Sequence, residues 1–113
     1  MKKDPRVYLA HILESAEWIE KDIRGMSAED FLDNVPIQDA VIRRIQIIGE
    51  AVKKLPDDVK EKAPDIPWRK IAGIRDKVIH DYVDVDIELV WGIIQKDLQA
   101  LKGKVEELLG DNA

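Results

Sequence analysis

Three side chains suited to phosphate chemistry lie close together in the run WRKIAGIRDKVIHDY, which spans residues 68–82: Arg75, His80 and Tyr82. Arginine carries a permanent positive charge and a planar fork of N–H donors that matches a phosphate group. Histidine has a reference pKa of about 6.5, so it exchanges protons near neutral pH, and tyrosine adds a hydroxyl. The three residue types together indicate phosphate chemistry.

Helical geometry limits how these side chains can act together. At about 100° per residue, Arg75 and Tyr82 fall within about 20° of each other, whereas His80 lies about 140° from Arg75. Either the helix ends near His80 and the chain turns, or a second copy completes the group across a two-fold axis. We favour the second, with the first contributing. In the alternative without a site, Arg75 and Asp76 are solvated charges, His80 caps or packs, and Tyr82 is a core aromatic.

Apolar residues recur at steps of three and four along the whole chain, and no strand-like alternation appears. This pattern predicts an all-α antiparallel bundle of four main helices and one or two short ones, in a single domain spanning residues 1–113. The last helix is expected to be continuous, with Asp84 or Asp86 as its N-cap. The expected long helices cover about 5–24, 36–54, 68 to a break near 82–85, and from there to about 109, with short helices near 31–32 and 57–62.

Several other residues have structural explanations that need no site. Gly49 and Gly73 are predicted to allow close helix packing. The three tryptophans are interpreted as core or interface anchors, not as platforms for stacked bases: Trp18, Trp68 and Trp91. The basic residues of the middle segment are interpreted as a solvated face: Lys53, Lys54, Lys60, Lys62, Arg69 and Lys70.

The net charge of −5 is distributed unevenly. Residues 36–77 carry ten Lys/Arg against seven Asp/Glu, while the segments on either side are acidic, so only a modest and salt-sensitive affinity for a phosphate backbone is expected. With no cysteine and two histidines, no metal site and no cofactor are expected. No signal peptide and no apolar run of membrane length is visible, so we expect a soluble, cytoplasmic protein.

The spacing Arg75-x4-His80-x-Tyr82 resembles the Arg-x4-His-x-Tyr signature of HepT-like toxins, a branch of the HEPN superfamily of small helical proteins. Two further segments are similar to that family: IRRIQIIGEAVKKLP at residues 42–56 and DVDIELVWGIIQKDLQAL at residues 84–101. The resemblance therefore covers nearly the whole chain.

This resemblance implies a homodimeric, metal-independent endoribonuclease, the toxin of a type II/VII-like toxin–antitoxin pair. Its cleft would lie at the dimer interface and use Arg75 and His80 of both copies on RNA. The implied partner is a MntA-like minimal nucleotidyltransferase antitoxin that transfers AMP from ATP to Tyr82. The family most often has asparagine after the arginine. Here the supporting residue is Asp76, whose negative charge bears on the strength of phosphate binding.

Two other hypotheses remain open at this stage. The chain could be a subunit without chemistry of its own, which binds substrate or nucleotide for a two-component nucleotidyltransferase. It could also be a bundle whose apolar seam merely assembles into an oligomer. The last hypothesis predicts that Arg75, His80 and Tyr82 lie far from any shared cleft.

Overall fold

The computed structural model describes residues 4–80 and 86–110, and within this range the side chains of residues 75–80 are outside the description. All elements in the described ranges are helices, so the predicted all-α, HEPN-like bundle is confirmed. Their bounds are α1 Pro5–Ile23, α2 Ala28–Leu32, α3 Val35–Lys54, α4 Asp57–Glu61, α5 Trp68–His80, α6 Ile87–Gln95 and α7 Asp97–Gly110.

Local capping residues set most of the helix ends. Asp4 caps α1, and Gly25 follows the end of α1 with a φ of 79°, in the left-handed region that favours glycine. Ser27 and Asp30 form a reciprocal capping box at α2, with hydrogen bonds of 3.1 and 3.0 Å. Asn34 caps α3. The ends of α1 and the start of α3 lie within one residue of the predicted bounds, because caps are short-range signals, whereas α2 begins three residues before the predicted 31–32.

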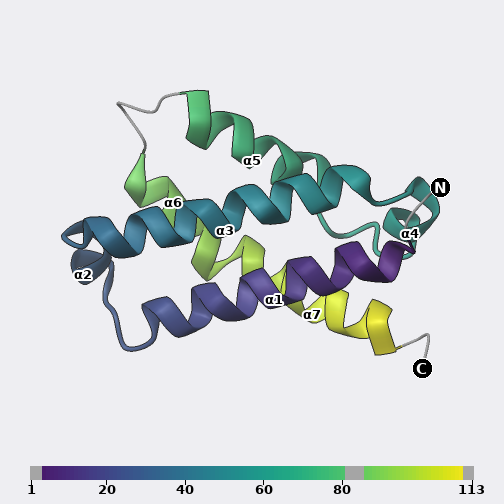
Figure 1. Cartoon of the computed structure of the whole chain (residues 1–113), viewed down its shortest axis with the longest axis horizontal. Helices are drawn as coiled ribbons and strands as arrows, with labels where there is room; N and C mark the ends of the chain where they lie inside the picture. The colour runs from purple at the N-terminus through teal and green to yellow at the C-terminus, as the bar shows by residue number, and fades with distance from the viewer. Residues whose placement is uncertain (1–3, 81–85, 111–113) are drawn as a thin grey trace.

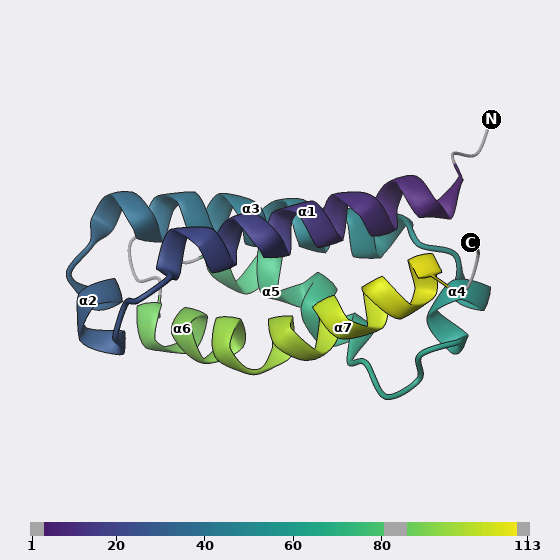
Figure 2. The same ribbon diagram turned by 90° about the horizontal axis from the view of Figure 1, so that it is seen from below.

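The five longer helices of the described residues pack in two layers. Figure 1 shows α3 between α1 and α5, and α3 packs against both. Figure 2, turned by 90°, shows α6 and α7 as a second layer below α1 and α3. Because α1 also packs against α7, the layers close around one apolar cluster. Helix α5 therefore lies at one side of the bundle, where part of its surface remains open.

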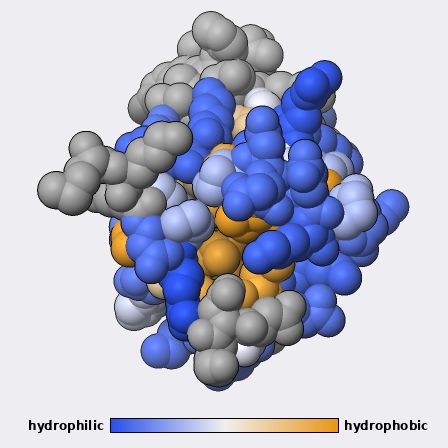
Figure 3. Space-filling view, turned by 90° about the vertical axis from the view of Figure 1, so that its right-hand side faces the viewer, coloured by the Kyte–Doolittle hydropathy of each residue, from blue (hydrophilic) through white to orange (hydrophobic). Residues whose placement is uncertain are grey.

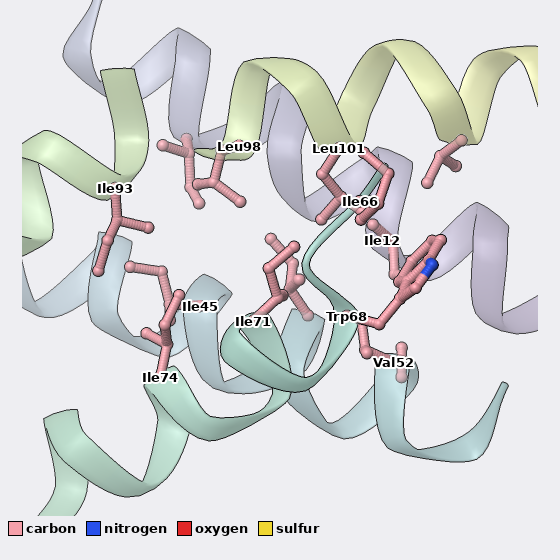
Figure 4. Close-up of a cluster of buried hydrophobic side chains, with 14 of the residues drawn as sticks. Ile12, Ile45, Val52, Ile66, Trp68, Ile71, Ile74, Ile93, Leu98 and Leu101 are labelled. Atoms are coloured by element: carbon pink, nitrogen blue, oxygen red, sulfur yellow. The ribbon is translucent and has the colours of Figure 1, made fainter. Parts of the chain in front are cut away.

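The first half of α5 is held by buried side chains. Trp68, Ile71 and Ile74 face the core, and Figure 4 shows Trp68 beside Val52 of α3. Farther along α5, Ile74 lies near side chains of both α3 and α6 in the same view. Burying these three side chains stabilises the fold by roughly 1.5–3 kcal/mol each. This face of α5 is thereby fixed toward α3 and α6.

Trp68 also anchors the start of α5 through its polar atom. Its side chain is 9% exposed, and its Nε1–H donates to the carbonyl oxygens of Lys60 at 3.1 Å and Ala63 at 3.0 Å. Lys60 belongs to α4, and Ala63 belongs to the segment between α4 and α5. Trp68 therefore joins the proline-rich connection to the core. This confirms the prediction that Trp68 is a core anchor.

A buried amide links α2 to α3. Gln38 Nε2 donates to the carbonyl oxygens of Phe31 at 2.8 Å and Leu32 at 3.0 Å, which lie at the end of α2. Phe31 is fully buried, and its ring centroid lies 5.2 Å from that of Trp91 on α6. Trp91 is half-buried and packs on the core, again as predicted. This cluster fixes where α6 begins relative to α3.

The prediction of one continuous last helix is wrong, because Lys96 separates α6 from α7 with φ −112° and ψ −65°. Its N–H still donates to the Gly92 carbonyl at 3.1 Å, so the chain changes direction without leaving a helical path (Figure 2). Directly after the break, Asp97 Oδ2 lies 3.2 Å from Lys70 Nζ of α5. The apolar seam keeps its spacing across Lys96, so the sequence pattern contained no sign of the bend.

The start of α6 confirms one of its two predicted caps. Asp86 Oδ1 accepts a hydrogen bond from the Leu89 N–H at 3.0 Å. The other candidate, Asp84, and the predicted break near 82–85 lie outside the described residues.

The end of the molecule that carries α4 is mainly hydrophilic, with hydrophobic surface in a hollow among polar residues (Figure 3). A pocket of about 450 Å³ lies at this end, lined by residues of α1, α4 and α7. It is far from the end of α5 that carries His80 (Figure 1). In the described ranges, none of the helices combines the length and the apolar character that crossing a bilayer requires.

Replacing Trp68 with phenylalanine is expected to lower the free energy of unfolding by about 1–3 kcal/mol, because two carbonyl oxygens lose their donor. Trp18→Phe is the control, since Trp18 is 42% exposed, and it should cost less than about 0.5 kcal/mol. Urea unfolding at fixed protein concentration measures both. Equal losses for the two variants would contradict the anchoring role of Trp68.

Candidate active site

Arg75 and His80 lie in the second half of α5, on one continuous helix. The buried face of Trp68, Ile71 and Ile74 holds the first half of this helix against the bundle. Toward His80, Figure 1 shows α5 separating from α3. The two candidate residues therefore occupy the part of α5 that extends away from its own bundle.

The register of α5 places the two residues on different sides. Arg75 comes seven residues after Trp68 and four after Ile71, so its position continues the line of core-facing positions. His80 comes seven residues after Gly73, on the opposite side of the helix, about 140° from Arg75. Because α5 remains helical through His80, the expectation that one regular helix does not aim both residues at one point is supported. Tyr82 lies outside the described residues.

A groove of about 380 Å³ runs between α5 and α6 beside this candidate site. It is lined by Arg69, Lys70, Gly73, Ile74, Leu89 and Ile93. A Cβ atom added to Gly73 would meet no heavy atom within 4 Å, so the prediction that Gly73 allows close helix packing is wrong. Gly73 faces an open groove. The bend between α6 and α7 is a tertiary feature, and the sequence around it did not indicate it.

The charges at the groove come from two neighbouring residues of α5. Lys70 is paired with Asp97, whereas Arg69 is exposed and forms no ion pair with the side chains that the structure describes. Arg69 was interpreted from the sequence as part of a solvated face. Its position eleven residues before His80, on the same side of the helix, is the signal that could have related it to the site.

A second pocket, of about 500 Å³, lies between α1 and α7 and has a different character. Its charged lining is balanced, with three glutamates against three cations: Glu14, Glu17, Glu20, Lys21, Arg24 and Lys102. Lys102 Nζ donates to Glu20 Oε2 at 2.9 Å, and this hydrogen bond raises the pKa of Lys102. Among the described side chains, no group of three or more His, Asp or Glu residues is arranged to hold a metal ion.

Trp18 borders the same pocket and is 42% exposed, so of its two predicted roles, core or interface anchor, the core position is not observed and the interface role stays a prediction. Its ring lies 5.0 Å from Lys21 Nζ and 5.5 Å from the guanidinium carbon of Arg44. The ring of Trp18 therefore makes cation–π interactions with two cations, which accounts for the exposure of this tryptophan on a polar surface. The ring joins α1 to α3 from outside the core.

Comparisons with known proteins identify the family of the chain. The family model described as "Ribonuclease HepT-like" matches residues 12–108. The chain belongs to the HepT-like ribonuclease family. The match includes all of α3, α5 and α6, and so both candidate residues of α5. No solved structure matches the chain at a significant level.

Several relatives of this HepT-like chain carry ribonuclease names. A Thermococcus cleftensis protein named "Probable ribonuclease HepT" is 46% identical over 96% of this chain and 98% of its own length. A Caldanaerobacter subterraneus protein named as a candidate RNase is 43% identical over 95% of this chain and 96% of its own length. A longer Methanocaldococcus jannaschii protein, named as a gamma-glutamylcyclotransferase and candidate RNase, is 45% identical over 96% of this chain and 49% of its own length.

The open space at Gly73 gives a direct test of the groove. Gly73→Ala is expected to raise the free energy of unfolding by up to about 1 kcal/mol, because alanine favours a helix and its methyl group meets no neighbour. Gly25→Ala is the control, since its φ of 79° should make the same change destabilising. Thermal and urea unfolding measure both variants. A destabilising Gly73→Ala would show that α5 packs more closely than described.

Proposed function

We propose that this chain is a metal-independent endoribonuclease, the toxin of a type II/VII-like toxin–antitoxin pair. The proposal is supported above all by the family match over residues 12–108, which contains the helix that carries Arg75 and His80. The ribonuclease names of relatives that align over their full length support the same activity.

The residue types account for cleavage without a metal ion. His80 takes the proton of a ribose 2′-hydroxyl as general base, or gives a proton to the leaving 5′-oxygen as general acid. Arg75 stabilises the negative charge that builds on the phosphoryl oxygens. The 2′-oxygen forms the new bond to phosphorus as the bond to the 5′-oxygen breaks. The products are a 2′,3′-cyclic phosphate and a 5′-hydroxyl.

A dimer reconciles this chemistry with the register of α5. The positions of Arg75 and His80 lie about 140° apart, which is unfavourable for two groups that must meet at one phosphate. A two-fold axis near the end of α5 would bring two copies of both residues to a shared cleft. The divergence of the α5 ribbon from α3 toward His80 is compatible with this arrangement (Figure 1).

Modification of Tyr82 is proposed as the means of silencing. A MntA-like nucleotidyltransferase would attach AMP to its hydroxyl, displacing pyrophosphate from ATP. Tyr82 is two residues from His80, so the added phosphate would place negative charge and bulk beside the site. That charge competes with the RNA backbone for Arg75.

His80→Ala is expected to lower RNA cleavage by about 10²- to 10⁴-fold, the usual contribution of a general acid or base. His11→Ala is the matched control, because His11 is the only other histidine and is exposed on α1. Cleavage should continue in excess EDTA and leave cyclic phosphate ends. An all-deoxy strand should resist, since it lacks the attacking hydroxyl. Equal activity of wild type and His80→Ala would rule out this mechanism.

Co-expression with a MntA-like nucleotidyltransferase should add one or more AMP masses to the wild-type chain, as measured by intact-mass spectrometry. Tyr82→Phe should lack these additions and keep its toxicity in the presence of the partner. Tyr8→Phe is the matched control, because the chain has two tyrosines, and it should be modified like wild type. Additions that persist in Tyr82→Phe would place the modification elsewhere.

A further inference from the structure

We propose that the groove between α5 and α6 binds a single-stranded segment of the RNA next to the cleaved phosphate, with Arg69 as its phosphate-binding residue. The inference rests on the proposed ribonuclease function and assigns a substrate-binding role to a surface outside the Arg-x4-His-x-Tyr motif. Three independent features of the groove lead to it: its register with His80, its apolar floor and a cation, Arg69, that forms no ion pair with the described side chains.

The register connects the groove to the candidate site. The positions on α5 that line the groove recur seven residues later, so position 73 leads to position 80 on nearly the same side of the helix. Seven residues correspond to about 10.5 Å along the axis, and the eleven from Arg69 to His80 to about 16 Å. A strand lying along this side of α5 would reach His80 within a few nucleotides.

The lining matches the two parts of a nucleotide. The floor is apolar, formed by Gly73 and Ile74 of α5 with Leu89 and Ile93 of α6. Leu89 is 47% exposed, which leaves an apolar surface that a flat base can cover. The absence of a side chain at Gly73 keeps this floor open toward α5. The groove thus combines apolar surface for a base with cationic residues for the backbone.

The charges single out Arg69. Lys70 is held by Asp97 at 3.2 Å, so much of its charge is already neutralised. Arg69 is exposed at the groove and unpaired among the described side chains, and its guanidinium can bind phosphate in a bidentate manner. The acidic residues Asp86 and Glu88 lie exposed at the start of α6 but do not line the groove. The backbone should therefore follow the α5 side.

Binding measured in a non-cleaving background tests the proposal. We would use full-length His80→Ala protein and a fluorescein-labelled, mixed-sequence single-stranded RNA, and follow anisotropy as a function of salt. Adding Arg69→Gln should weaken binding roughly tenfold, as loss of a charged hydrogen bond predicts. The slope of log K against log salt should become shallower by about 0.7, the value for one phosphate contact on a single strand.

Two further variants separate a specific groove from a general charge effect. Arg24→Gln removes the same charge at the end of α1, across α3 from α5, and should change binding less than twofold (Figure 1). Gly73→Leu should fold at least as stably as wild type, because the site is open, yet weaken RNA binding by filling the groove. Circular dichroism and light scattering monitor the fold and the oligomeric state.

Each outcome of these binding measurements supports or overturns the groove as an RNA-binding site. Equal effects of Arg69→Gln and Arg24→Gln, or normal RNA binding by Gly73→Leu, would overturn the groove as an RNA site. Loss of dimer mass in the groove variants would assign the groove to a second copy of the chain instead. Because binding is measured without cleavage, a wild type that binds through Arg69 but does not cleave would refute only the nuclease function.

Discussion

The rotation of α5 about its own axis is the constraint on which the rest of the structure depends. Trp68, Ile71 and Ile74 bury one face of this helix against α3 and α6. Turning α5 by one residue position, about 100°, would move Arg69 or Lys70 toward the core. Burying an unpaired charge costs several kcal/mol, far more than the helix could recover elsewhere. The direction of every later position in α5 is therefore set by three apolar side chains in its first two turns.

The fixed rotation of α5 also bears on why a charged residue, Arg75, occupies a position in line with core-facing residues. The position of Arg75 continues the line of Trp68 and Ile71, which in an ordinary buried helix would carry an apolar residue. Figure 1 shows the ribbon of α5 diverging from α3 toward His80. In the proposed dimer this part of α5 meets the second copy, and the position of Arg75 lies where the two would join.

The sequence predicted the helices more accurately than their contacts, and the difference has a physical cause. Caps such as Ser27 with Asp30, or Asn34, act within three residues, so their signals are complete in a short stretch. The bend at Lys96 lies beside a contact with α5, and the apolar spacing continues through it. Gly73 has the same local context whether a neighbour approaches it or not, so its open surroundings could not be predicted.

The same distinction between local signals and tertiary contacts applies to the candidate site. The residue types and spacing of Arg75 and His80 predict phosphate chemistry, and this stays a prediction. Helical geometry predicts that the two positions diverge, which the continuous helix α5 supports. Arg69 was interpreted as part of a solvated face because charged residues are usually exposed. Only the position of α6, which depends on the cluster of Phe31, Trp91 and Gln38 near the start of α3, turns that part of α5 into the wall of a groove.

The open surroundings of Gly73 have a consequence for how such a protein can diverge. Side chains on the inner face of α5 are held by packing, so most substitutions there are removed by loss of stability. On the outer face, a Cβ atom at position 73 meets no heavy atom within 4 Å, so substitutions there are expected to cost little stability. Related chains can therefore acquire different surfaces beside His80 while keeping one scaffold. Substitutions on one side of α5 are limited by the stability of the fold, whereas substitutions on the opposite side can adapt the protein to new substrates.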